Sequence, residues 1–72
     1  MALGERLHQL RELANLSQNE LAKRASVPRP IISMVESGKQ KSMSLENARR
    51  IARVLGVTLD LLAGEGEDAN PA

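Results

Sequence analysis

The sequence contains no cysteine and no aromatic residue among its 72 residues. Without cysteine the chain forms neither disulfide bonds nor thiolate metal sites, which fits a reducing compartment. Without Phe, Tyr or Trp, the core has to be built from aliphatic side chains and methionine, a composition suited to packed helices. No apolar stretch is long enough for a signal peptide or a membrane span, so we expect a soluble cytoplasmic protein.

The chain also has little that would support catalysis. A domain of this length buries only roughly 60% of the surface that its unfolded form exposes, so a large catalytic cleft is not expected. Its one histidine, His8, shares a helix face with Glu5 and Glu12, which favours a solvated surface over a metal site. The stretch "ESGKQKS" resembles a phosphate loop only superficially. The pattern requires a glycine at the position of Ser33 and a Ser or Thr at the position of Gln40. We therefore predict no enzyme activity, no metal and no cofactor.

The net charge of +1 hides an asymmetry along the chain. Residues 1–59 contain all ten basic residues and five acids, a balance of +5, whereas residues 60–72 contain four acids and no base, a balance of −4. A basic body of this kind is typical of a domain that binds a polyanion. We expect a folded domain over residues 1–63 and an acidic, disordered tail or linker over residues 64–72.

The spacing of apolar residues predicts five helices joined by short turns. The stripe on the first helix consists of Leu3, Leu7, Leu10 and either Leu13 or Ala14. This helix should end near Asn15, with Leu16 filling the core from the turn. Ser17 and Glu20 form a capping box that predicts the start of a second helix. The second helix should bury Leu21, Ala22 and Ala25.

The third helix should run from about Pro28 to Ser37 and stop at Gly38. Its inward residues should be Ile32 and Val35, which are three positions apart.

Two further helices are predicted after a polar loop. Ser44 should cap the fourth helix, which should close at Gly56. Its apolar stripe consists of Leu45, Ala48, Ile51, Ala52 and Leu55. Thr58 should cap a short fifth helix with Asp60 in its first turn.

The second and third helices, joined by a short turn at "ASV", predict a helix-turn-helix. The segments "LSQNELAKRASVPRPIISMVESGK" and "SLENARRIARVLGVTLDLL" then resemble the lambda repressor-like, Xre/Cro-type helix-turn-helix family over about residues 3–63. The matching positions are Leu16-Ser17-Gln18, Leu21-Ala22, Ile32-Ser33, Glu36, Gly38-Lys39 and Ala52 with Leu55-Gly56-Val57. The resemblance implies a compact all-α fold of five helices and a transcriptional regulator, in the simplest case a repressor, that binds a double-stranded DNA operator.

The resemblance also implies roles for individual residues. The third helix would lie in the major groove, with base contacts from Pro28, Arg29, Pro30, Ser33 and Met34. Phosphate contacts would come from Ser17, Gln18, Ser37, Lys39 and Lys41. Arg11 and Glu36 match a pair that joins the first helix to the third, although a partly exposed pair of this type would contribute little energy.

The third helix departs from the family pattern at its start. Relatives usually carry hydroxyl or amide side chains where this chain has its prolines, and glycine where it has Ser26. Arg29 suits a bidentate contact with guanine, and the prolines and Met34 suit thymine methyl groups. With fewer hydrogen-bonding groups, the helix would depend more on DNA shape.

Several alternatives remain open at this stage. Arg49, Arg50 and Arg53 form either a solvated face with Glu46 or a phosphate contact. One recognition helix reads few base pairs, so we expect a homodimer. Its candidate interface residues are Val57, Leu59, Leu61 and Leu62, which core packing would also explain. No small-molecule effector is indicated, and the alternative function is an antitoxin-like or other protein-interaction module.

Overall fold

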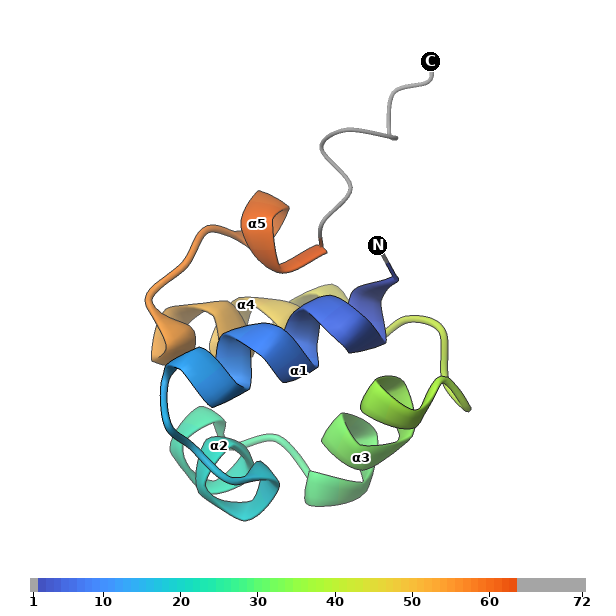
Figure 1. Cartoon of the computed structure of the whole chain (residues 1–72), viewed down its shortest axis with the longest axis horizontal. Coiled ribbons are helices and arrows are strands. Elements are labelled where there is room, and N and C mark those ends of the chain that lie inside the picture. The colour runs from blue at the N-terminus through green and yellow to red at the C-terminus, as the bar shows by residue number, and fades with distance from the viewer. Residues whose placement is uncertain (1, 64–72) are drawn as a thin grey trace.

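The computed structural model describes residues 2–63, and the predicted tail at residues 64–72 lies outside the described residues. Five helices account for the regular structure of the described part (Figure 1). They are α1 (Leu3–Leu13), α2 (Gln18–Ala25), α3 (Arg29–Ser37), α4 (Leu45–Leu55) and α5 (Leu59–Ala63). The predicted all-α fold of five helices is confirmed. None of the helices in this part of the chain is long and apolar enough to cross a membrane.

Hydroxyl side chains start three of the helices. Ser17 Oγ accepts a hydrogen bond from the Glu20 N–H at 3.0 Å, and Glu20 Oε1 accepts one from the Ser17 N–H at 2.8 Å. This backbone hydrogen bond lowers the pKa of Glu20. Ser44 Oγ caps α4 at 3.1 Å from the Asn47 nitrogen. Thr58 Oγ1 caps α5 in the same way, at 3.0 Å from the Leu61 nitrogen. The three predicted helix starts are confirmed.

Residues with a left-handed backbone conformation end three of the helices, and a fourth such residue lies in the turn after α1. Gly38 and Gly56 have φ angles of 87° and 73°, so both predicted glycine stops are confirmed. Ser26 ends α2 in the same region with a φ of 57°, where glycine would be less strained. Asn15 also has a positive φ of 64°, which a short amide side chain tolerates. Because Asn15 does not have the helical conformation, α1 ends at Leu13, slightly earlier than expected.

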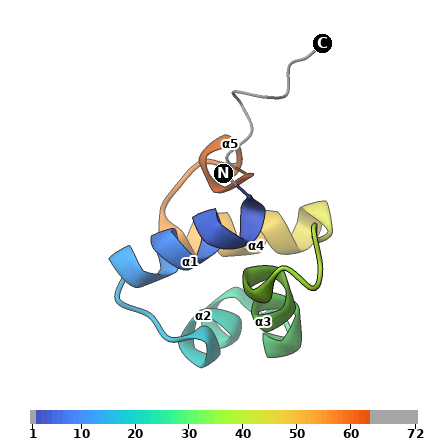
Figure 2. The same cartoon turned by 45° about the vertical axis from the view of Figure 1, so that its right-hand side comes forward.

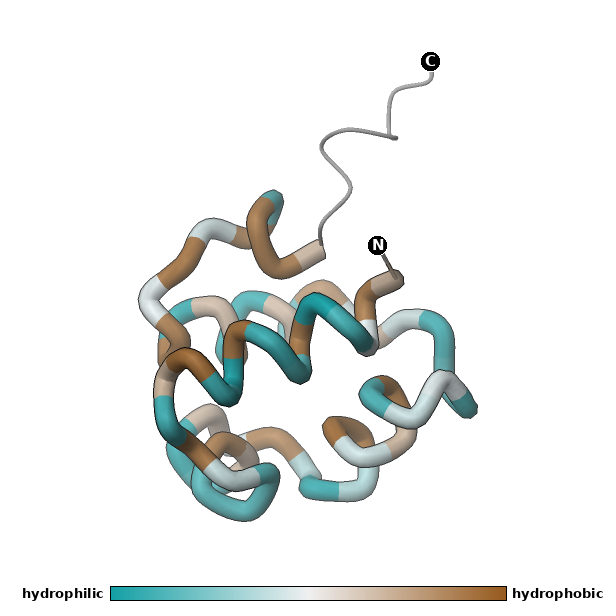
Figure 3. Tube along the Cα trace, in the orientation of Figure 1, coloured by the Kyte–Doolittle hydropathy of each residue, from teal (hydrophilic) through white to brown (hydrophobic). Residues whose placement is uncertain are grey.

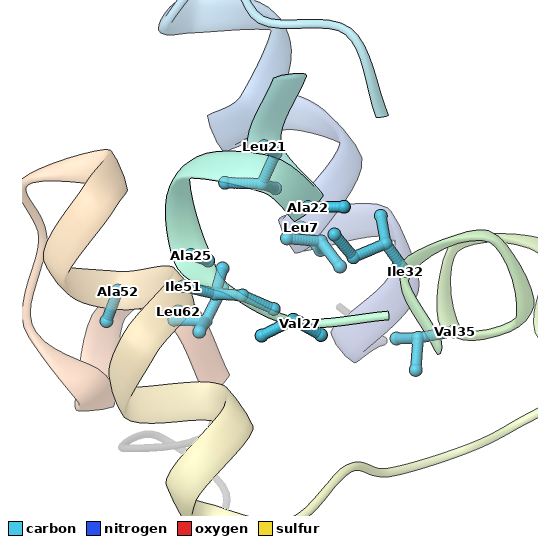
Figure 4. Packing of buried hydrophobic residues seen from close by; sticks show 10 residues of the cluster. All are labelled: Leu7, Leu21, Ala22, Ala25, Val27, Ile32, Val35, Ile51, Ala52 and Leu62. Carbon is cyan, nitrogen blue, oxygen red and sulfur yellow. The ribbon is translucent and has the colours of Figure 1, made fainter. Parts of the chain in front are cut away.

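The core receives side chains from all five helices (Figure 4). The buried hydrophobic residues are Leu7, Leu21, Ala22, Ala25, Val27, Ile32, Val35, Ile51, Ala52 and Leu62. Hydrophobic and hydrophilic residues alternate along the helices, as Figure 3 shows, so each helix turns one side inward. The inward residues predicted for α2 and α3 are confirmed.

Two predictions about burial were wrong, and one buried residue was missed. Leu13 is 83% exposed and Ala14 is also exposed, so the stripe on α1 ends at Leu10. Leu45 is 56% exposed at the start of α4, where no other helix covers it fully. Val27 is 4% exposed and was missed, because it lies in the turn between α2 and α3 and belongs to no helical stripe.

Helices α1 and α4 lie between the other three helices (Figure 2). α2 and α3 lie on one side of this pair and α5 lies on the other (Figure 2). α1 contacts α3 and α5, whereas α2 contacts α3 and α4. This arrangement leaves the side of α3 that faces away from α1 and α2 uncovered by other described helices.

Candidate functional site

The outer surface of α3 is the first candidate region. Pro28, Arg29 and Pro30 are exposed, Met34 is 36% exposed, and Ser33 is half-buried. The inner side of the helix is formed by the buried Ile32 and Val35. The five residues expected to contact bases therefore lie on the side of α3 that is not in the core, although Ser33 is less accessible than expected.

Two prolines determine how α3 begins. Pro28 is the N-cap, with φ −58° and ψ 132°, so the helix itself starts at Arg29 and not at Pro28 as expected. The Ile31 N–H donates to the Pro28 carbonyl oxygen at 3.0 Å and closes the first turn. The two N–H groups that the prolines lack would have no partner within the helix, because they belong to its first turn. They therefore stiffen the start of α3 without breaking a helical hydrogen bond.

Gly4 allows α1 to lie directly against α3. A Cβ atom at this position would overlap the Val35 carbonyl oxygen and would lie 3.2 Å from the Glu36 Cα atom. Only glycine permits such a close approach between two helix backbones. The sequence reasoning missed this residue, because a glycine near the start of a helix carries no periodic signal.

Arg11 and Glu36 form a bidentate ion pair between α1 and α3. Arg11 Nε donates to Glu36 Oε2 at 2.7 Å, and Arg11 Nη2 donates to Glu36 Oε1 at 3.0 Å. The two side chains are only 10% and 7% exposed. Arg11 Nη1 also donates to the Leu16 carbonyl oxygen at 2.8 Å. The pair is therefore buried, and it joins α1, the turn after it and α3.

Two more side chains converge on the Glu36 carboxylate. Gln18 Nε2 donates to Oε1 at 3.1 Å, and His8 Nδ1 lies 3.3 Å from the same oxygen. Burial raises the pKa of Glu36, but its hydrogen bonds with Arg11, Gln18 and His8 outweigh burial, and the pKa lies below its usual value. The hydrogen bonds to Glu36 raise the pKa of Arg11, although burial opposes this shift. The only acid in α3 is thus turned inward and paired.

Three of the residues expected to contact phosphate make hydrogen bonds inside the protein. Ser17 caps α2, and the amide of Gln18 donates to Glu36, but each keeps a further donor hydrogen. The Ser37 hydroxyl donates its hydrogen to the Met34 carbonyl oxygen at 3.1 Å and accepts from the Lys39 N–H at 3.4 Å. Ser37 therefore shapes the loop after α3 and has no hydrogen left to donate to a phosphate.

Basic side chains flank α3 at both ends. Arg29 stands at its start, and Lys39 and Lys41 follow its end; all three are exposed. Within residues 2–63, none of the three forms an ion pair with an acidic side chain within 4 Å. The outer surface of α3 and the loop after it are therefore positively charged without local compensation.

The expected dimer interface is only partly exposed. Leu62 is 0% exposed, so its assignment to an interface was wrong: it fills the chain's own core. Val57 packs against the core and Leu59 is half-buried, whereas Leu61 is 43% exposed. Beside α5, a cavity of about 360 Å³ is lined mainly by apolar side chains that include Leu45.

Comparisons with known proteins agree with this geometry. Residues 7–62 match the family described as Helix-turn-helix. Over 66 residues the chain is 42% identical to the HTH-type transcriptional activator BcrR of Enterococcus faecalis, an alignment that covers 90% of this chain and 32% of that protein. The chain thus spans about a third of the length of this curated relative.

Two solved structures have the same arrangement of helices. The N-terminal DNA binding domain of SinR from Bacillus subtilis matches with a TM-score of 0.84 and 29% identity, over 90% of this chain and 94% of that one. A structure of the SinR protein/SinI protein complex matches with a TM-score of 0.84 and 27% identity, over 97% of this chain and 68% of that one.

Proposed function

The chain belongs to the helix-turn-helix family, in its lambda repressor-like (Xre) type, and from this premise we propose that it binds double-stranded DNA sequence-specifically as a transcriptional regulator. The observation that carries the proposal is the distribution of charge on α3. Its one acid, Glu36, is buried against Arg11, so its outer surface presents Arg29 and neutral side chains. Such a surface meets the acceptor atoms of base edges without repulsion.

In the proposed complex, α3 lies in the major groove. Arg29 donates two hydrogen bonds to the O6 and N7 atoms of a guanine, the commonest specific contact of this side chain. Met34, Pro28 and Pro30 contact thymine methyl groups, and Ser33 accepts from or donates to a base edge at the margin of the contact. Because the start of α3 is already rigid, less conformational entropy is lost when it binds.

Phosphate contacts hold α3 in register. Ser17 caps the Glu20 N–H, but the N–H groups of Gln18 and Asn19 at the start of α2 have no partner within the helix, so this helix start attracts a phosphate. Lys39 and Lys41 contact the backbone beyond the other end of α3. These contacts carry no sequence information, and their strength falls as salt is raised.

We further propose a homodimer that represses transcription by occupying a promoter. Two copies of α3 would read two half-sites about 34 Å apart. Leu61, together with the half-buried Leu59 and Val57, is the candidate interface, because Leu61 is the exposed leucine of α5. Promoter occupancy requires only the DNA contacts and the dimer.

The test begins with selection of bound duplexes from a random DNA library, followed by titration of the selected duplex. We expect a palindromic motif, two chains per duplex at saturation, and a loss of about 1–3 kcal/mol for Arg29→Ala that is concentrated at one base position. Arg49→Ala removes an exposed arginine from α4 and serves as the matched control. The proposal fails if no motif emerges and Arg29→Ala binds as the wild type does.

A protein-interaction module is the second candidate function. Pro28 and Pro30 remove two N–H groups from the start of α3, and the apolar cavity beside α5 offers a docking surface lined in part by Leu3, Met43 and Leu45. One of the matching structures is a complex of SinR with another protein, SinI. Co-purification with an unrelated protein, together with no salt-dependent binding to duplex DNA, would favour this function.

A further inference from the structure

Three arginines from two helices line one cavity. Arg24 comes from the last turn of α2, and Arg50 and Arg53 come from α4. The packing of α2 on α4 brings them together around a space of about 280 Å³, whose remaining lining is Ser26 with the small apolar Ala25 and Val54. We call this the arginine cavity.

One of the three guanidinium groups is held in place. Arg50 Nη1 donates to the Ser26 carbonyl oxygen at 3.1 Å, and Arg50 Nη2 lies 2.6 Å from Glu46 Oε2. The other two are not paired in this way: in the described part of the chain, neither Arg24 nor Arg53 lies within 4 Å of an acidic side chain. The cavity therefore contains one ion pair and two further cations.

Local features compensate only part of this charge. The C-terminal ends of α2 and α4 carry partial negative charge, equivalent to roughly half an elementary charge each. Glu20, one turn before Arg24, has its carboxylate hydrogen bonded to the Ser17 N–H at the start of α2. Part of the role of Arg24 and Arg53 is thus to stabilise two helix ends, and a test has to separate this role from binding.

The position of the cavity indicates its ligand. Ser26 lies in the turn that leads into α3, two residues before Pro28, and its carbonyl oxygen is the group that holds Arg50. The arginine cavity therefore includes part of the turn that precedes α3, whereas Lys39 and Lys41 follow the end of α3. A duplex whose major groove contains α3 presents sugar-phosphate backbone along both edges of the groove, close to the segments on either side of the helix, because the groove is only about 12 Å wide.

We propose that Arg24, Arg50 and Arg53 form a second phosphate-binding site, which takes the DNA backbone flanking the segment read by α3. Arginine suits this role, because its planar guanidinium group binds phosphate through two parallel hydrogen bonds. The inference rests on the proposed DNA binding and adds to it a contact from α2 and α4. The added contact lengthens the DNA segment that each chain covers, on the side of the turn between α2 and α3.

The test compares two double variants that lose the same charge from the same helices. Arg24→Gln with Arg53→Gln removes the two unpaired arginines, and Lys23→Gln with Arg49→Gln removes exposed bases that do not line the cavity. Arg53→Gln alone serves as a milder variant if the first pair proves unstable. Affinity for the selected duplex is measured at several salt concentrations, with the flank either long or trimmed.

We expect the cavity variant to make the slope of log K against log salt less negative, by about 0.9 for each phosphate contact that is lost. On the trimmed duplex, wild type and cavity variant should have the same slope. The control pair should change the slope by less, and by the same amount on both duplexes. Urea unfolding of each variant reports the helix-end role separately, since that role changes stability and not the salt slope.

The outcomes distinguish the two proposals. If cavity and control variants give equal slopes while the wild type binds its selected duplex, the arginine cavity is not a phosphate site and the proposed function stands. If the wild type binds no duplex at all, both proposals fall. If the cavity variant loses only the binding of a poly-glutamate peptide, the cavity recognises an acidic protein segment and the inference is overturned.

Discussion

On the inner side of α3 the carboxylate of Glu36 accepts hydrogen bonds from Arg11 and Gln18, whereas on its outer side Arg29 forms no ion pair with the rest of residues 2–63. The difference follows from solvation. A buried charge is stable only when it is paired and hydrogen bonded, while an exposed one is stabilised by water. The inner side therefore orients α3 against α1 and α2, and the outer side stays open to a partner. Changes on the inner side should alter stability, and changes on the outer side should alter binding.

The largest effect is expected from Glu36→Ala. This change leaves the Arg11 guanidinium buried without its partner, which typically costs about 3–5 kcal/mol of unfolding free energy. Urea unfolding measures the loss, and Arg29→Ala on the outer side should stay within about 0.5 kcal/mol of the wild type. Replacing both partners by apolar residues, as Arg11→Met with Glu36→Leu, should recover much of the loss. Equal stabilities for Glu36→Ala and Arg29→Ala would remove the distinction between the two sides.

A smaller effect is expected from Gly4→Ala, and its sign is informative. Alanine normally stabilises a helix interior relative to glycine by about 0.5–1 kcal/mol. Here its Cβ atom would overlap the Val35 carbonyl oxygen, and overpacking of this kind costs about 1–3 kcal/mol. We expect a net loss of about 1–2 kcal/mol in urea unfolding. A gain in stability would show that α3 moves away from α1 at little cost.

The smallest effect is the pH dependence of the inner side. The pKa of Glu36 is lowered by folding, so its contribution to stability is fully present above the pKa of the unfolded chain, about 4.3. It is lost as the pH falls through the lower pKa of the folded state. Wild type should therefore exceed Glu36→Gln in stability at pH 7, and the difference should shrink below about pH 4. A difference that is constant across this range would contradict the assignment.

Much of the fold could be predicted because helix boundaries depend on local chemistry. Ser17, Ser44 and Thr58 each satisfy an N–H group within three residues, and Gly38 and Gly56 each adopt the conformation that ends a helix. These interactions involve neighbours in the chain, so their sequence patterns are sufficient to identify them.

The failures have a shared cause in packing between distant segments. Leu13 and Leu45 fit the helical stripes but are not fully covered by neighbouring helices, whereas Val27 lies outside any stripe and is buried. The exposed fraction of a residue depends on which other segments reach it, and helical periodicity carries no information about that.

The sequence by itself determined five helices, their caps and the positive charge at both ends of α3, because capping and charge depend on the nature of single residues and their near neighbours. Only the tertiary structure decided that Gly4 meets the backbone of α3, that the Glu36 carboxylate is buried, and that Arg24 lines one cavity with Arg50 and Arg53. These features arise between residues that are more than twenty positions apart, and helix packing alone sets the distances between them.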